Sequence, residues 1–232
     1  MNASRRDFLD RLAVGAAVLG GLPPALGLAA RSLGAAPATS PAPAPRRQSE
    51  WDLSWVTRLN GKHKVVFDVP EVESGYGVWR ASIWARQYQD VLDVPASALS
   101  AAVVLRHNGI MLAMQQAFWD EYGIGKAKNV THPITLQPTD RNPVLLSERD
   151  GVAEPFASFA LDKLLARGGV VLACDLALQE CIQLIKAKHG VSDEAARKRA
   201  LALMVPGVVL QPSGVFSVVR AQEAGCHYVR AS

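Results

Sequence analysis

Short, strongly apolar runs rich in valine and leucine recur along this chain, and stretches with helical spacing separate them. These runs lie at 64–69, 101–106, 170–174, 208–210 and 227–229. Continuously apolar runs are typical of strands that are buried on both faces, as in parallel sheets. Helices between such strands supply the crossovers that parallel pairing needs. The pattern therefore predicts an α/β fold with a parallel or mostly parallel sheet, covered by helices on both faces.

The helical segments show apolar residues three and four positions apart, together with recognisable end signals. Gly168 and Gly169 end one segment, and Ser192 is placed to cap the start of another. The stretch 129–149 is rich in proline, threonine and asparagine and predicts a long loop or excursion. The segments with helical spacing are 79–92, 110–122, 156–165, 176–189, 192–204 and 215–224.

The N-terminal segment has the features of an export signal. Residues 4–9 read Ser-Arg-Arg-Asp-Phe-Leu, and a weakly apolar run of small residues follows at 12–21. Paired arginines before such a run are typical of a twin-arginine (Tat) signal, although Asp10 stands where these signals often place a lysine. A membrane anchor needs about 20 strongly apolar residues, and the two prolines at 23–24 end this run too early. A first structural helix is the alternative interpretation.

The sequence divides into three parts. Residues 1–36 are predicted to be the Tat signal peptide, and residues 37–50 a linker rich in proline and alanine. Such a composition favours extended, polyproline-like chain and cannot build a core. The remainder, 51–232, has the size of one domain with its own core. We therefore expect a periplasmic protein exported through the Tat pathway, with the Tat translocase as its partner during export.

The charge pattern argues against nucleic acid as a partner. The net charge is only +4, and the basic residues are scattered. The one dense basic run, 197–199, follows Asp193 and Glu194 in a helical segment, which is typical of a solvated helix face. The sequence contains neither a glycine-rich phosphate loop nor a GxSxG elbow, and its histidines lack metal-ligand spacing. No metal and no cofactor are therefore expected.

Cysteines are few and odd in number, which does not suggest a disulfide framework in an exported chain. Cys174 and Cys181 would lie about 10 Å apart along a helix, too far to bridge. Cys181 occupies an apolar helical position, and Cys226 stands just before the last predicted strand. We interpret both as packing residues.

Two reactive side chains fall at the carboxyl ends of predicted core strands, His107 and Cys174. Ligands of open parallel sheets bind beyond these ends. A histidine beside a cysteine can take its proton, and a helix starting after the cysteine favours the thiolate. The alternative is that Cys174 is simply buried and His107 bonds a turn. The Ser213–Gly214 pair before the last helical segment could likewise bind an anion or only cap that helix.

The residues around these positions resemble the DsrE/DsrF-like family of small α/β proteins. The segment 103–109, Val-Val-Leu-Arg-His-Asn-Gly, is similar to an apolar strand of that family ending in His-Gly. The segment 171–178, Val-Leu-Ala-Cys-Asp-Leu-Ala-Leu, is similar to a strand that ends in cysteine and leads into a helix. The closing segments 205–214 and 221–229 look like the last strand, turn, helix and terminal strand of the family. The resemblance covers 62–230, nearly the whole body.

This resemblance implies a single doubly wound sheet with flavodoxin-like layering and assembly into homo-oligomers, trimers or hexamers. In some members a cysteine transfers sulfur as a persulfide, and Cys174 matches that position, with His107 as its neighbouring histidine. The chain departs from the pattern at Asn108, which interrupts His-Gly, and at Asp175, whose negative charge opposes thiolate formation next to it.

Two functions are therefore expected. The first is an exported DsrE-like protein that binds or relays a sulfur species through Cys174, with His107 orienting or deprotonating the thiol. Its partners would be a small sulfur species or a sulfur-carrier protein. The alternative is a non-catalytic periplasmic binding or assembly module in which Cys174 is packed.

Overall fold

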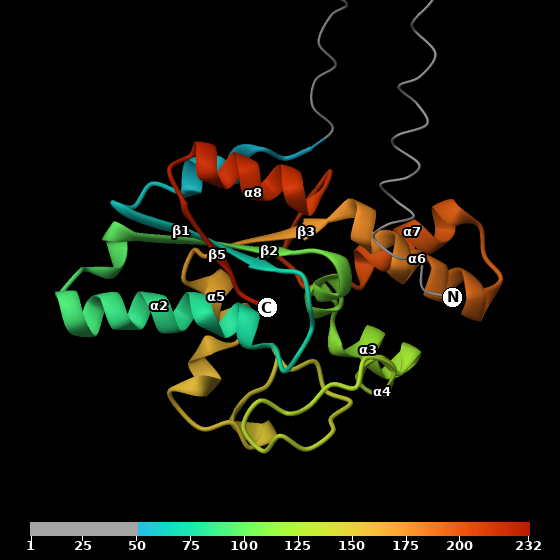
Figure 1. Ribbon diagram of the computed structural model, residues 1–232. Coiled ribbons are helices and arrows are strands. Elements are labelled where there is room, and N and C mark those ends of the chain that lie inside the picture. The colour runs from blue at the N-terminus through green and yellow to red at the C-terminus, as the bar shows by residue number, and fades with distance from the viewer. Residues whose placement is uncertain (1–50) are drawn as a thin grey trace, which may run out of the picture. The chain divides into compact units, whose positions relative to one another are not determined.

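A five-stranded, all-parallel sheet forms the centre of the protein, with helices on both of its faces (Figure 1). The computed structural model describes residues 51–232, so the predicted signal peptide and linker, 1–36 and 37–50, lie outside the described residues. The strand order is β4-β3-β2-β1-β5. The strands are β1 (His63–Val69), β2 (Leu99–Leu105), β3 (Val170–Cys174), β4 (Val209–Gln211) and β5 (His227–Arg230).

The central strands are buried on both sides, as their continuous apolar runs predict. In β2, Val103 and Leu105 belong to the core on one side of the sheet, whereas Ala102 and Val104 belong to the core on the other. All four are fully buried. Because side chains alternate along a strand, only an uninterrupted apolar run can fill both cores.

Helices cover the two faces of the sheet unequally (Figure 1). One face packs against α8 and the short helix η2 and is called here the α8 face. The opposite face packs against α2, α5, α6 and α7 and is called the α2 face. None of the described helices is long and apolar enough to cross a membrane. The α-helices are α2 (Tyr76–Leu92), α3 (Gln116–Tyr122), α4 (Ile124–Ala127), α5 (Leu161–Ala166), α6 (Asp175–His189), α7 (Asp193–Ala202) and α8 (Gly214–Glu223), and the 3-10 helices are η2 (Ser54–Arg58), η3 (Ala96–Ala98), η4 (His107–Ala113), η5 (Glu148–Asp150) and η6 (Phe156–Phe159).

The chain changes sheet face between β3 and β4. After β3 it continues into α6 on the α2 face, and after β4 it continues into α8 on the α8 face. The sheet is therefore doubly wound, as expected. Adjacent strands whose connections leave on opposite faces open a crevice at their carboxyl ends, which is where open α/β sheets bind ligands. Cys174 is the last residue of β3 and lies at this point.

Two predicted helices are broken in the structure. The segment 156–165 consists of η6 and α5, separated at Ala160, whose ψ of 151° is extended. The break lets the amide of Leu161 donate to the carbonyl of Val144 at 2.8 Å. In a continuous helix the amide of Leu161 would instead donate to a carbonyl of the preceding turn.

The segment 110–122 is broken for a similar reason. It consists of part of η4 and of α3, with an extended link between them. Within this link the amide of Gln115 donates to the carbonyl of Leu203, and the amide of Val205 donates to the carbonyl of Ala113, both at 2.8 Å. These bonds fasten the link to the end of α7 and exclude a continuous helix.

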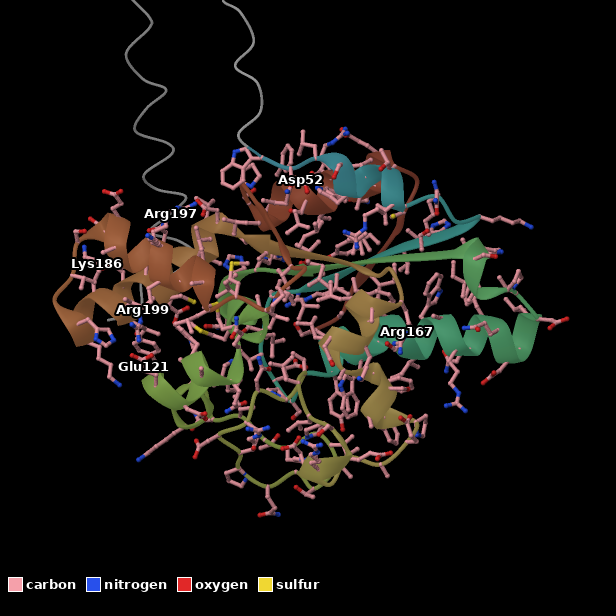
Figure 2. The ribbon with its side chains drawn as sticks, turned by 180° about the vertical axis from the view of Figure 1, so that it is seen from behind. Asp52, Glu121, Arg167, Lys186, Arg197 and Arg199 are labelled. Carbon is pink, nitrogen blue, oxygen red and sulfur yellow. The ribbon has the colours of Figure 1, made fainter. Side chains whose placement is uncertain are left out.

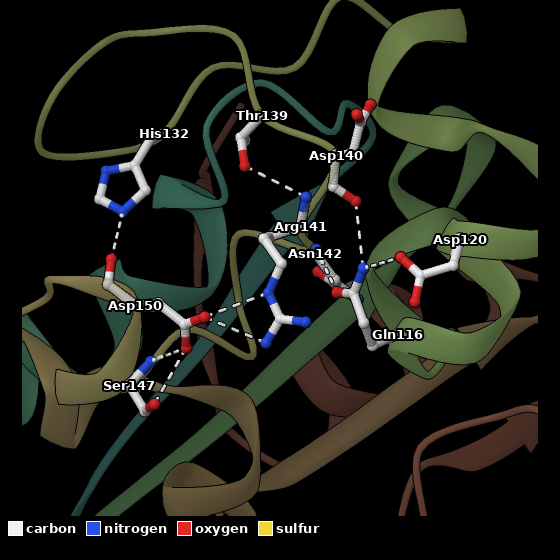
Figure 3. Close-up of polar contacts among 9 residues, drawn as sticks. All are labelled: Gln116, Asp120, His132, Thr139, Asp140, Arg141, Asn142, Ser147 and Asp150. Atoms are coloured by element: carbon white, nitrogen blue, oxygen red, sulfur yellow. Dashed lines mark hydrogen bonds and ion pairs between the residues drawn. The ribbon is translucent and has the colours of Figure 1, made fainter.

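The predicted excursion 129–149 is held by its own polar side chains, several of which Figure 3 shows. Asn142 is completely buried and donates to the carbonyls of Leu112 and Met114 at 3.3 and 2.7 Å. Arg141 forms an ion pair with Asp150 at 3.1 Å. Val144 anchors the loop in the core of the α2 face. This segment therefore packs on the face of the sheet opposite to α8.

Candidate functional site

A row of polar side chains crosses the α8 face at the carboxyl ends of the strands. We call Asp68, Arg106, Cys174 and Gln211 the carboxyl-edge row. Leu105 pairs with Ala173, so Arg106 and Cys174 come next in the same register, and Cys174 pairs with Gln211. Neighbouring strands lie about 4.8 Å apart. The row therefore brings a carboxylate, a guanidinium, a thiol and an amide side by side.

Arg106 and Asp68 form a two-pronged ion pair at one end of the row. Arg106 donates from Nε and Nη2 to the two carboxylate oxygens of Asp68, at 2.6 and 2.7 Å. The hydroxyl of Tyr228 on β5 donates to the same carboxylate at 2.9 Å. The side chains of Asp68 and Arg106 are only 3% and 21% exposed, so water screens the pair weakly. The hydrogen bond to Asp68 raises the pKa of Arg106, which keeps the guanidinium charged.

Arg106 also comes directly after β2, the strand that pairs with the strand of Cys174. The two side chains interact electrostatically. The Nη1 atom of Arg106 has no hydrogen-bond partner within residues 51–232. The aliphatic part of the Arg106 side chain lies against Gly214 at the start of α8. A Cβ added to Gly214 would lie 2.6 Å from the Cβ of Arg106. The guanidinium is therefore fixed between a carboxylate, a helix start and the thiol.

Cys174 is 6% exposed and stands at the N-cap position of α6. The amino end of a helix carries a partial positive charge, which favours an anion there. Asp175 is the first residue of this helix, and its Oδ1 atom lies 2.7 Å from Nη2 of Arg197 on α7, without the alignment of a hydrogen bond. Figure 2 labels this arginine on α7. The positive charge of Arg197 thus balances the negative charge of Asp175, which is expected from the sequence to oppose thiolate formation at Cys174.

Gln211 lies on the other side of Cys174 and is completely buried. Its amide nitrogen donates to the carbonyls of Asp52 and Leu210, both at 2.8 Å. Its Oε1 atom has no hydrogen-bond partner among the described residues. Buried acceptors are nearly always paired in native proteins. Gln211 thus leaves one buried acceptor without a partner on the strand that pairs with Cys174.

His107 does not occupy the position that the sequence predicts for it. Its imidazole is exposed, and it forms neither a hydrogen bond nor an ion pair with Cys174 or with any other residue in 51–232. The chain leaves β2 after Leu105, and the φ of His107 is 46°, in the left-handed region. Because side chains alternate along an extended segment, Arg106 rather than His107 lies on the same face as Cys174.

A second polar cluster continues from η4. Asn108 donates to Glu71 at 2.8 Å and accepts from Lys128 at 2.7 Å. Lys128 also forms an ion pair with Glu180 on α6 at 2.7 Å. These bonds hold η4 and α6 together, so Asn108 has a structural role here.

The other two cysteines are packing residues, as predicted. All three cysteines are free, and Cys181 is completely buried with its Sγ 3.9 Å from the sulfur of Met111. Burial raises the pKa of Cys181 to about 12 and also raises the pKa of Cys226. Neither thiol is therefore prepared to react.

Ser213 is a helix cap in the structure. It caps α8 by accepting the amide hydrogen of Phe216 at 3.1 Å. The part of the chain that the structure describes contains no group of three or more histidine, cysteine or acidic residues able to hold a metal ion. Asp68, Arg106, Gln211 and Tyr228 were not predicted as site residues. The only signal for Arg106 is its place one residue after a buried strand.

Comparison with known proteins leaves the chain without an assigned family. No family model matches it, and no curated protein matches it. Among solved structures, the chain is similar to a protein of unknown function from Methanobacterium thermoautotrophicum. The two share 16% sequence identity and a TM-score of 0.38, over 72% of this chain and 98% of that one.

Proposed function

We propose that this protein is an exported, DsrE-like protein that binds or relays a sulfur species through Cys174. The observation that carries the proposal is the register that places Cys174 between Arg106 and Gln211 at the switch point of the sheet. A thiol there lies at the ligand-binding edge of the fold. It also has a fixed cation on one side and an acceptor without a partner on the other.

The proposed reaction is a transfer of sulfane sulfur. The thiolate of Cys174 attacks the terminal sulfur of a polysulfide, or the outer sulfur of thiosulfate. A sulfur–sulfur bond of the donor breaks and one forms at Cys174. The electron pair leaves with the donor, as a shortened polysulfide or as sulfite, and the proton of the thiol passes to solvent. Cys174 then holds a persulfide, and no external oxidant or reductant is needed.

In this proposal Arg106, rather than His107, is the charged side chain beside the thiol. Donors such as polysulfide and thiosulfate are anions, and a charged guanidinium beside the thiol attracts them and stabilises the persulfide anion. The bond to Asp68 fixes the guanidinium in place but uses only its Nε and Nη2 atoms. Because Cys174 is only 6% exposed, a small donor fits the proposal better than a bulky one.

Mass spectrometry of the intact protein tests this proposal. After exposure to polysulfide or thiosulfate, the protein should gain the mass of one sulfur atom, and dithiothreitol should remove it. Cys174→Ser should abolish the gain, whereas Cys226→Ser is the matched control and should retain it. Arg106→Met should slow the gain. Alkylation of Cys174 only after denaturation, with no added sulfur, would rule the relay out.

The alternative function, an assembly module, is supported by apolar side chains exposed on α8 and β5. Val215 and Val219 are 65% and 46% exposed, and Tyr228 and Val229 are 45% and 38% exposed. β5 is also an edge strand of the sheet, and such edges invite pairing. We propose that these residues join copies into a trimer or hexamer. Sedimentation should show an oligomer that Val219→Glu dissociates; a monomeric protein would reject this function.

A further inference from the structure

A cavity of about 550 Å³ opens at the amino ends of the strands. Cys174 lies at the opposite, carboxyl ends. The walls of the cavity are the start of β2, the residues just before β3, α2, and the η6–α5 segment. This volume lies within the range of small-molecule sites, about 300–1,000 Å³. The cavity is therefore separate from the carboxyl-edge row and large enough for a ligand of its own.

The lining of the cavity is positively charged. Arg58, Arg86 and Arg167 line it, and no aspartate or glutamate does. Arg86 is paired with Asp90 on the outer surface of α2 at 3.2 Å. Neither Arg58 nor Arg167 forms an ion pair with any residue in 51–232, although Arg58 attracts the exposed Asp52 from a distance. Two positive charges therefore lie at the cavity without a bonded carboxylate.

Both of these guanidinium groups are held in position by neutral acceptors of the cavity wall. Arg58 donates from Nη2 to the carbonyl of Gly169 at 2.8 Å. Arg167 donates from Nη1 to the carbonyl of Ser158 at 2.7 Å and from Nη2 to the hydroxyl of Ser82 at 3.0 Å. Figure 2 shows Arg167 beside α2. Orientation without charge neutralisation leaves each guanidinium able to bind an anion.

One part of the cavity offers an apolar surface. Trp84, Phe159 and Leu164 line it. Trp84 is held by aromatic contacts with Tyr88 and Phe67, at ring distances of 4.9 and 6.4 Å. Uncharged polar side chains, including those of Ser82 and Gln89, line it as well, so apolar and polar surface are mixed in this cavity. Here the polar groups that carry charge are cations.

We propose that this cavity binds an amphiphilic organic anion. A carboxylate or sulfonate head group is held by Arg58 and Arg167, and a hydrocarbon body lies against Trp84, Phe159 and Leu164. Charge selects the head group, and burial of the hydrocarbon body against the apolar side chains adds to the affinity. The site does not involve Cys174, so it stands independently of sulfur relay.

Titration calorimetry of the full chain with decanoate tests the proposal. Decanoate should bind, and Arg167→Met should weaken it at least about tenfold, the value of one charge-assisted hydrogen bond. Arg220→Met is the matched control, because Arg220 pairs with Glu223 on the other side of the sheet and its loss should leave binding unchanged. Decanol, which lacks the charge, and acetate, which lacks the apolar body, should both bind at least about tenfold more weakly.

A second variant guards against misfolding of Arg167→Met. Ser97 is an exposed residue of the cavity lining, so Ser97→Glu adds a repelling charge without removing a wall hydrogen bond. It should weaken decanoate binding to a similar extent, and Cys174→Ser should leave binding intact. Equal binding of decanoate and decanol, no measurable binding of decanoate, or unchanged binding in both Arg167→Met and Ser97→Glu would overturn the proposal.

Discussion

Gly214 and Arg106 are in direct contact, because a Cβ on Gly214 would lie 2.6 Å from the Cβ and 2.7 Å from the Cδ of Arg106. Real Cβ atoms do not approach other atoms so closely, so any side chain here must displace the arginine or the start of α8. The glycine thus keeps room for the cation beside Cys174.

Gly214→Ala should therefore destabilise the protein by about 1–3 kcal/mol, as overpacking does. It should also change the rate at which Cys174 takes up sulfur, because Arg106 moves. Urea unfolding and the intact-mass assay measure the two effects. Val215→Ala is a suitable control, since Val215 is the next residue of α8 and is 65% exposed. A Gly214→Ala protein as stable as the control would show that Arg106 relaxes freely.

Asp68→Asn should cost about 3–5 kcal/mol, because it leaves Arg106 largely buried without its counter-charge. Tyr228→Phe removes only one hydrogen bond to the same carboxylate and should cost about 1 kcal/mol. Both values come from urea unfolding monitored by tryptophan fluorescence. Equal effects of the two substitutions would mean that the ion pair adds nothing beyond a neutral hydrogen bond.

The stability of the protein should fall at alkaline pH because of Cys181. Burial raises the pKa of this thiol from 9.0 to about 12. Between these two values the unfolded chain releases the proton while the folded protein keeps it, so unfolding becomes more favourable as pH rises. Unfolding at pH 8, 9.5 and 11 should show this slope, and Cys181→Ala should reduce it even though the variant is less stable throughout. Native-state alkylation of Cys181 at pH 8 would contradict the burial that causes the shift.

The contact between α3, α6 and α7 should weaken in acid. Arg199 donates to both oxygens of Glu121 at 2.9 Å, and Figure 2 labels these two residues. His189 bonds the same carboxylate at 2.7 Å. The hydrogen bond from Arg199 lowers the pKa of Glu121 below 4.5. Its contribution is therefore complete above pH 4.5 and is lost as the pH falls through the lower, folded value. Melting temperatures at pH 7 and pH 3 should differ less in Glu121→Gln than in the natural protein.

Export can be tested with the arginine pair itself. The Tat pathway reads the two arginines of its signal, so replacing both Arg5 and Arg6 by lysine should leave the protein in the cytoplasm of a bacterial host. Fractionation with an antibody to the C-terminal domain measures this. A control with Arg11→Lys keeps the pair and should be exported. Export of the double variant as efficient as that of the Arg11→Lys control would remove the Tat assignment.

The α/β architecture could be predicted because local patterns determine it. Runs such as Val103-Val104-Leu105 are apolar without interruption, and only strands buried on both faces use such runs. The helix breaks at Ala160 and before Gln115 could not be predicted, because they depend on hydrogen bonds to Val144 and Leu203 in distant segments. Local propensity carries no information on such bonds.

The candidate site was predicted in part. The position of Cys174 at a strand end follows from its apolar run. His107 is expected as its partner only because a histidine can take the proton of a thiol, and the sequence does not show which way its side chain points. The register that pairs Leu105 with Ala173 decides that Arg106 is the neighbour of Cys174. Register between strands that lie about 70 positions apart arises from packing of the whole sheet, so single residues do not reveal it.

The position of β5 has a consequence for the order in which this protein can be made. β5 pairs with β1, and the hydroxyl of Tyr228 bonds a carboxylate 160 positions earlier in the chain. A ribosome releases β1 long before it releases β5, so until β5 is made Asp68 lacks one of its partners and β1 lacks one of its neighbours. Such long-range closure is slow. β5 therefore completes the pairing of β1, and a chain that is interrupted before β5 leaves β1 as an edge strand of the sheet.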